Sequence, residues 1–260
     1  MSWVVVVPVK GNPGAKTRLG GPAPDRAQLA DAFALDTVAA LAAAAPVLTV
    51  FVVTGDTVLG AELARLGARV VPEVRGAPGP GTAGPDGTDA GHPFAGSRPA
   101  GPADPLNAAI DVGLAAAATA FPAAHRAVIT GDLPALTADD VERTLALAAH
   151  HERSMVPDAD ETGTTMLLAL AGVPISPHFG PGSRAAHEAA GHVPLALPAR
   201  SGIRRDVDTP ADLALIERLG AGPHTSALLA AASARRDALD VTAAVPDPVT
   251  VPSADSPLEK

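Results

Sequence analysis

Lys10, Lys16 and Arg18 place three positive charges directly after a run of valines near the start of the chain, in the sequence WVVVVPVKGNPGAKTRLGG. The whole chain has only three lysines, and two of them stand here. Compact ammonium groups on flexible stems, in a turn containing Gly and Pro, are suited to binding phosphate oxygens. A tight turn with solvated cations would also explain these residues, so the rest of the chain must decide.

Two common phosphate-binding loops are excluded at this position by their spacing. A Walker A loop needs Gly directly before the Lys and another Gly six positions before it, whereas Ala15 and Lys10 hold those places here. A dinucleotide-binding GxGxxG motif is also missing, because no third Gly follows Gly11 and Gly14 in register.

Asp132 follows a short apolar run in the sequence AVITGDLPAL. In open α/β sheets, ligands bind beyond the carboxyl ends of the strands, where this carboxylate could hold a Mg²⁺ ion beside a nucleotide phosphate. A simple turn residue between Gly131 and Pro134 is the alternative. Helix capping does not require Asp132, because Thr137 with Asp140 three residues on already resembles a capping box.

A second acidic group lies downstream in the sequence RRDVDTPADL. Thr209 and Pro210 read as the N-cap and first residue of a helix, with Asp212 at its third position. Capping leaves Asp206 and Asp208 unexplained. Two carboxylates two residues apart on an extended segment point to the same side and could complete a metal site with Asp132. The alternative is a surface salt bridge with Arg204 or Arg205.

Two neutral segments are candidates for binding a second anion. Gly163-Thr164-Thr165 offers hydroxyl and backbone N–H groups ahead of an apolar strand, and Phe179-Gly180-Pro181-Gly182-Ser183 leads into a helix. Each segment alone is more often a turn or a cap. His178, His187 and His192 show no nucleophile pattern and are interpreted as surface or loop residues.

The elements that must position these residues alternate between short β-rich runs and Ala-rich helical stretches, which predicts an α/β domain with a mainly parallel sheet. The predicted strands are Val4 to Pro8, Leu48 to Thr54, Arg69 to Pro72, Ala127 to Thr130, Ser154 to Pro157, Thr165 to Ala169 and Val193 to Pro198. The predicted helices are Asp25 to Ala44, Val58 to Leu66, Leu106 to Thr119, Ala138 to His150, Ser183 to Ala190 and Ala211 to Leu219.

The composition narrows the class of partner. The net charge of -9, with one Trp, five Phe and no Tyr, argues against nucleic acid and anionic membrane surfaces and favours a small molecule. The absence of cysteine excludes thiolate metal sites and fits a reducing cytosol. No apolar run reaches the roughly 20 residues that a bilayer requires, so we expect a cytoplasmic protein.

Six motifs in this order resemble the CofC/FbiD family of 2-phospho-L-lactate or phosphoenolpyruvate guanylyltransferases, within the MobA-like nucleotidyltransferases. They cover roughly residues 4 to 219 and are PVKGNPGAKTRL, DPLNAAI, TGDLPAL, GTT, FGPGS and RDVDTPADL. The resemblance implies a Rossmann-like nucleotidyltransferase domain that joins GMP from GTP to a phosphorylated three-carbon acid and releases pyrophosphate. That reaction belongs to the biosynthesis of coenzyme F-420.

The resemblance also implies roles for individual residues. Lys10, Lys16 and Arg18 would hold the GTP triphosphate, with Lys16, Arg18 and Asp132 as catalytic residues and Asn107 near the nucleoside. Asp132 with Asp206 or Asp208 would bind Mg²⁺. The matching positions for the phosphorylated acid are Thr165, Gly180 and Ser183.

The expected organisation is one nucleotidyltransferase domain over residues 1–220, with a flexible Gly/Pro-rich insertion at 76–104. Residues 221–260 are expected to form a short helical piece and a disordered tail. The sequence does not choose between phosphoenolpyruvate and 2-phospho-L-lactate. Alternatives are a related enzyme that acts on a sugar phosphate or a molybdopterin-type acceptor, and a catalytically silent nucleotide-binding protein.

Overall fold

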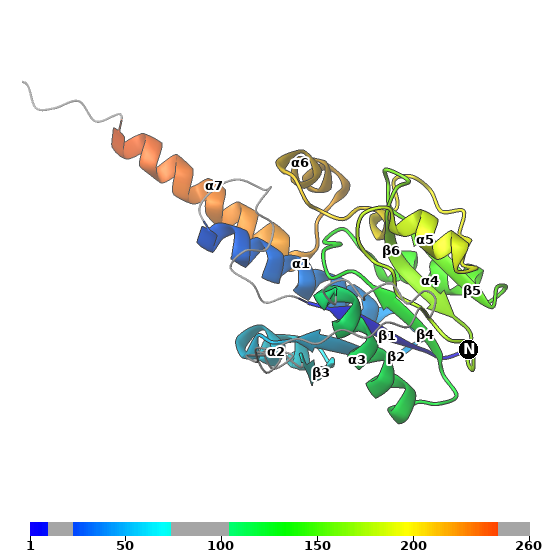
Figure 1. Cartoon of the computed structure of the whole chain (residues 1–260). Helices are drawn as coiled ribbons and strands as arrows, with labels where there is room; N and C mark the ends of the chain where they lie inside the picture. The colour runs from blue at the N-terminus through cyan, green and yellow to red at the C-terminus, as the bar shows by residue number, and fades with distance from the viewer. Residues whose placement is uncertain (10–22, 74–103, 244–260) are drawn as a thin grey trace, which may run out of the picture.

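The computed structural model describes residues 1–9, 23–73 and 104–243, which form a seven-stranded sheet with helices on both faces (Figure 1). The strands are β1 (Trp3–Pro8), β2 (Val47–Thr54), β3 (Arg69–Pro72), β4 (His125–Ile129), β5 (Arg153–Pro157), β6 (Thr164–Ala169) and β7 (Val193–Pro194). The helices are α1 (Ala23–Ala43), α2 (Thr57–Arg65), α3 (Pro105–Ala120), α4 (Ala138–Ala148), α5 (Ser183–Ala189), α6 (Pro210–Leu219) and α7 (Pro223–Ala243), with a 3-10 turn η2 (Gly202–Arg204).

The strand order is β3-β2-β1-β4-β6-β5-β7. All neighbouring pairs are parallel except those made by β6, which runs antiparallel to both β4 and β5. This arrangement confirms the predicted α/β class with a mainly parallel sheet. Because β6 is reversed, its first residues lie at the same edge of the sheet as the carboxyl ends of β1, β4 and β5.

The two faces of the sheet carry separate apolar layers. Side chains alternate along β1, so that Val5 and Val7 pack with α1, α2 and α4, whereas Val4 and Val6 pack with α3. All four valines are fully buried. A strand buried on both faces explains why its sequence is a continuous apolar run.

The last strand is shorter than predicted, ending at Pro194 instead of Pro198. A proline carries no N–H group for the ladder, so pairing with β5 cannot continue regularly through this residue. The N–H of Leu195 still donates to the carbonyl of Met155 at 2.8 Å, after which the chain leaves the edge of the sheet.

Helix α7 is longer than the short helical piece that was expected, and it lies along α1 (Figure 1). Its first turn is held by the buried carboxylate of Asp36 in α1, which accepts from the N–H groups of His224 and Thr225, both at 2.9 Å. The negative charge also interacts favourably with the positive end of the α7 helix dipole.

The described residues 1–9, 23–73 and 104–243 contain no helix that could cross a membrane. The tail at 244–260 and, apart from Asp104, the expected insertion at 76–104 lie outside the described residues.

Candidate active site

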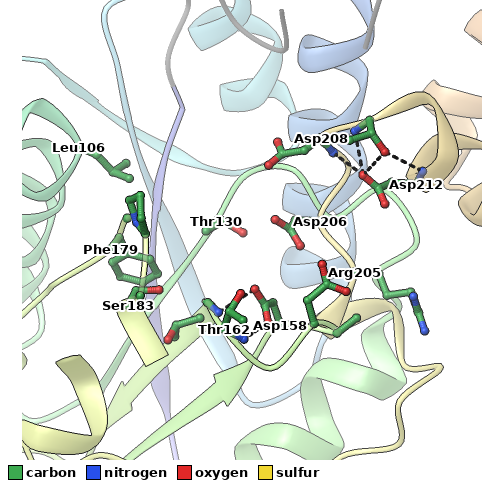
Figure 2. Close-up of a pocket in the computed structure, with 18 of the residues that line it drawn as sticks. Leu106, Thr130, Asp158, Thr162, Phe179, Ser183, Arg205, Asp206, Asp208 and Asp212 are labelled. Carbon is green, nitrogen blue, oxygen red and sulfur yellow. Dashed lines mark hydrogen bonds between the residues drawn. The ribbon is translucent and has the colours of Figure 1, made fainter. Parts of the chain in front are cut away.

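A pocket of about 850 Å³ lies at the edge of the sheet where β4 and β5 end and β6 begins. In Figure 2, Asp206 and Asp208 stand on one side of this pocket, Phe179 and Ser183 on the other, and Thr130 between them. The acidic side and the neutral side therefore correspond to the two kinds of site that the sequence suggested. The remaining lining includes the β5–β6 loop, with Asp158 and Thr162.

The acidic side brings together Asp132, Asp206 and Asp208. Each offers one carboxylate oxygen, and these oxygens all lie within 4.8 Å of one another. Val207 between the two downstream aspartates is fully buried against Phe33 and Ile216. Because neighbouring side chains of an extended segment point to opposite sides, burial of Val207 turns both aspartates outward together. The expected juxtaposition of the three carboxylates is thus present.

Close backbone packing holds the two halves of this cluster side by side. The N–H of Val207 donates to the carbonyl of Asp132 at 3.2 Å. Gly202 lies so close to the loop after β4 that a Cβ at this position would overlap the carbonyl of Ala135. Only a glycine allows that approach without movement of one segment.

Arg204 fixes the same segment to the β5–β6 loop. Its buried guanidinium donates to the carbonyls of Pro157, Leu197 and Asp158 and to the Glu161 carboxylate, at 2.6 to 3.2 Å. Hydrogen bonds from Arg204 and Arg184 lower the pKa of Glu161. The alternative, a surface salt bridge between Arg204 and Asp206 or Asp208, is therefore wrong for Arg204, because its side chain is buried against the β5–β6 loop.

Helix capping accounts for Thr209 and Asp212 as predicted. Thr209 accepts from the N–H of Asp212 at 3.3 Å, and Asp212 accepts from the N–H of Thr209 at 2.8 Å, which completes a capping box at the start of α6. Asp212 also accepts from the N–H of Asp208 at 3.2 Å. Asp212 therefore lines the pocket, and its main role is to hold the backbone of Asp208 in place.

The neutral side of the pocket contains Gly180 and Ser183, and their contact with the acid stays a prediction. Gly180 and Gly182 have positive φ angles of 132° and 73°, a conformation that side chains other than glycine rarely adopt. The backbone N–H of Gly163 was expected to be available to an anion. It instead donates to the Asp158 carboxylate at 2.8 Å, within the β5–β6 turn.

The two threonines at the start of β6 face different parts of the protein. Thr164 lines the pocket, whereas Thr165 is 1% exposed and donates its hydroxyl to the carbonyl of Ile203 at 2.7 Å. Thr165 thereby ties β6 to the turn that precedes Asp206. A direct contact of Thr165 with the acid stays a prediction.

Asn107 holds the Phe179 loop against α3. Its side-chain oxygen accepts from the N–H of Phe179 at 2.9 Å, and its amide donates to the Phe179 carbonyl at 3.0 Å and to Asp104 at 2.7 Å. These bonds position one wall of the pocket. The expected proximity of Asn107 to the nucleoside stays a prediction.

Lys10, Lys16 and Arg18 lie outside the described residues. The described chain does locate the point from which their segment departs. Val9 follows the carboxyl end of β1 and packs beside Gly131, the residue directly before Asp132. Val9, the residue before Lys10 in the sequence, thus lies at the edge of the sheet where the pocket lies.

His187, in helix α5, is neither a surface nor a loop residue, which corrects the sequence-based interpretation; His192 does lie in a loop, between α5 and β7, but is not at the surface. Their exposed fractions are 0% and 3%, and burial lowers the pKa of both. A signal was present in the sequence, because Ser183 and His187 stand four residues apart on α5 and share one face. A Ser183 that faces inward therefore carries His187 inward with it.

The fold and the position of the pocket define a nucleotidyltransferase-like α/β protein. A solved structure described as a nucleotide-diphospho-sugar transferase from Desulfovibrio desulfuricans G20 has this fold, with a TM-score of 0.60 and 18% identity. The likeness covers 93% of this chain and 98% of that one.

Sequence relatives give the family. The phosphoenolpyruvate guanylyltransferase of Thermomonospora curvata is 44% identical over 231 residues, which cover 88% of this chain and 90% of the relative. The enzyme of the same name from Streptomyces scabiei is 43% identical and matched over 97% of its length. The chain belongs to the phosphoenolpyruvate guanylyltransferase family, which confirms the resemblance seen in its motifs. No protein-family model matches the chain.

Proposed function

We propose that this protein transfers GMP from GTP to phosphoenolpyruvate and releases pyrophosphate, as a step towards coenzyme F-420. The observation that carries the proposal is one pocket with an acidic wall and a neutral Gly/Ser/Thr wall, in a chain whose relatives are named for this reaction. An acidic wall suits a cation that accompanies a triphosphate. A neutral wall with hydroxyl groups suits a small anionic acceptor.

The residues present fit a divalent cation. Three carboxylate oxygens lie close together, one each from Asp132, Asp206 and Asp208. Carboxylate oxygen is the donor type that Mg²⁺ prefers. Thr130, which also lines the pocket, has a buried hydroxyl oxygen without a hydrogen-bond partner among the described residues, as expected where a ligand completes the site. When bound there, Mg²⁺ would neutralise negative charge on the α-phosphate during transfer.

The reaction needs no general base from the protein. An oxygen of the acid's phosphate group, which is already ionised at neutral pH, attacks the α-phosphorus of GTP. The bond from that phosphorus to the oxygen bridging to the β-phosphate breaks, and pyrophosphate departs with the electron pair. The protein contributes by positioning the two anions and by neutralising charge.

We assign the remaining roles on the same basis. Lys10, Lys16 and Arg18 neutralise the triphosphate and the departing pyrophosphate. Asn107 lies near the nucleoside and also holds the Phe179 loop. Gly180 and Ser183 receive the acid. Thr165 supports the pocket through Ile203 and is the further candidate for contact with the acid.

Pyrophosphate release from purified protein tests the proposal. We expect release with GTP, Mg²⁺ and phosphoenolpyruvate, and little with a sugar 1-phosphate as acceptor. A parallel arm with 2-phospho-L-lactate measures the choice between the two acids, and arms with ATP, CTP and UTP measure the choice of base. Absence of pyrophosphate with either phosphorylated acid would contradict the proposal.

A further inference from the structure

The neutral wall of the pocket has two parts, Thr164 at the start of β6 and the Phe179 to Ser183 loop. His187 lies beneath this wall and contacts both parts. The side chain is fully buried, with its ring centroid 5.2 Å from that of Phe179 in an edge-to-face arrangement. One ring nitrogen, Nδ1, lies 2.9 Å from the hydroxyl oxygen of Thr164 at the start of β6. The other, Nε2, lies 2.9 Å from the backbone nitrogen of His178, at the start of the Phe179 to Ser183 loop.

These partners determine which nitrogen carries the proton. The backbone N–H of His178 can only donate, so Nε2 of His187 must accept with its lone pair. In a neutral imidazole the proton then resides on Nδ1, which donates to the Thr164 hydroxyl oxygen. A protonated ring would direct a second N–H group at the N–H of His178 and lose that bond.

The surroundings of the ring favour this neutral form. Burial, followed by the neighbouring rings of His192 and His178, lowers the pKa of His187 to about 4. The ring therefore keeps one donor and one acceptor at neutral pH.

The bond from His187 also orients the Thr164 hydroxyl. Because the hydroxyl oxygen already accepts from Nδ1, its own proton can be donated elsewhere. The Thr164 hydroxyl also lies 3.8 Å from the sulfur of Met155, which is a weak acceptor. An anionic oxygen in the pocket, which Thr164 lines, would be a stronger acceptor than this sulfur.

We infer that His187 is a positioning residue for the acceptor: it holds the Thr164 hydroxyl and the Phe179 to Ser183 loop in one arrangement and makes Thr164 a donor towards the phosphorylated acid. This inference rests on the proposed function, since it assigns the ligand of the same pocket. His187 acts through Thr164 and the N–H of His178, and it need not touch the substrate itself.

His192 provides a matched control. It is also buried, and its ring centroid lies 5.8 Å from that of His187. Its Nδ1, however, pairs with the carbonyl of Ser154 on β5, at 3.1 Å, and neither Ser154 nor His192 lines the pocket. Loss of His192 thus removes a buried imidazole without removing a contact to either part of the neutral wall.

Steady-state kinetics of pyrophosphate release separates these roles. For His187→Leu we expect the KM for phosphoenolpyruvate to rise about tenfold, the loss expected for a hydrogen bond to a charged ligand, with the KM for GTP within about twofold. His187→Gln keeps one donor and one acceptor and should restore most of the affinity for the acid. His192→Leu should leave the KM for the acid at the wild-type value.

Thr164→Val keeps the inference testable if His187→Leu fails to fold. We expect the same rise in the KM for phosphoenolpyruvate. In the double variant His187→Leu with Thr164→Val, this KM should be no higher than in the single variant with the higher KM, because both changes remove one linked interaction. Wild-type protein that releases no pyrophosphate overturns the proposed function. An active wild type whose Thr164→Val variant retains the wild-type KM for the acid overturns only the role of His187.

Discussion

The backbone N–H of Val207 donates to the carbonyl oxygen of Asp132, and this bond joins the loop after β4 to the segment before α6. Val207 is buried beneath the bond, so Asp206 and Asp208 on either side of it lie beside Asp132. The metal site that we propose is therefore built mainly by backbone packing. The carboxylates themselves are added to an arrangement that the chain already fixes.

Asp206→Asn should lower turnover by roughly 10²-fold or more, because the change removes a negative charge from the proposed cation site while keeping the shape of the side chain. Asp132→Asn should behave alike. Pyrophosphate release measured over a range of Mg²⁺ concentrations tests both variants, and circular dichroism checks that they fold. Asp139→Asn, at an exposed position in the first turn of α4, is the control. Unchanged turnover of Asp132→Asn and Asp206→Asn at low Mg²⁺ would refute the metal role.

Gly202→Ala should destabilise the protein by about 1–3 kcal/mol, because the added methyl group overlaps the carbonyl of Ala135 and forces η2 away from the loop after β4. Activity should fall as well, since the displacement separates the acidic residues. Urea unfolding measures the first effect and pyrophosphate release the second. Gly60→Ala in helix α2 meets only ordinary contacts and should be neutral or stabilising by about 0.5–1 kcal/mol. Equal stability of the two variants would contradict the argument.

Asp36→Ala should lower the free energy of unfolding by about 1.5–3 kcal/mol, the usual contribution of hydrogen bonds to a charged group, because α7 loses the carboxylate that accepts from its first N–H groups. Urea unfolding measures this loss, and limited proteolysis should cleave α7 earlier than in the wild type. Asp111→Ala, on the exposed face of α3, should change neither the free energy of unfolding nor the cleavage rate. A normal cleavage rate would mean that packing along α1 alone secures the helix.

Lys16→Ala should raise the KM for GTP by roughly tenfold, as expected for loss of a charge-assisted contact to phosphate, with little change in the KM for the acid. Arg65→Ala removes an exposed cation at the end of α2 and serves as the control. A GTP dependence equal to that of the wild type would return Lys16 to the interpretation as a solvated turn residue.

The acidic wall could be predicted from the sequence because local rules determine it. Asp132 follows a buried strand, and capping explains Thr209 but leaves Asp206 and Asp208 over, so the alternation of side chains predicts their common direction. The antiparallel course of β6 was not predicted, since an apolar run carries no sign of its direction.

The neutral wall was harder to predict because it depends on long-range contacts. Which of Thr164 and Thr165 faces the pocket is set by the register of β6 against β4 and β5, and a shift by one residue would exchange their roles. His187 looked like a surface residue because neither of its partners lies within one helical turn of it. Only the folded chain brings Thr164 and His178 to its two nitrogens.

Acid should destabilise the protein in a way that depends on His187. The pKa of this residue is lowered to about 4 in the folded protein from an ordinary value of 6.5, so between these values the unfolded chain binds more protons. The stabilisation is fully present above pH 6.5 and is lost as the pH falls towards 4, by at most about 1.4 kcal/mol per pH unit. Burial lowers the pKa of His192 too, which adds a loss in the same direction.

Urea unfolding at pH 7.5, 6 and 5 measures this dependence. In His187→Gln the buried titrating group is absent, so the free energy of unfolding should fall less between pH 7.5 and 5 than in the wild type. His150→Gln, at an exposed position after α4, should keep the wild-type dependence. If His187→Gln and the wild type lose the same free energy over this range, the ring is not held neutral by its surroundings, and the proton assignment that makes Thr164 a donor is wrong.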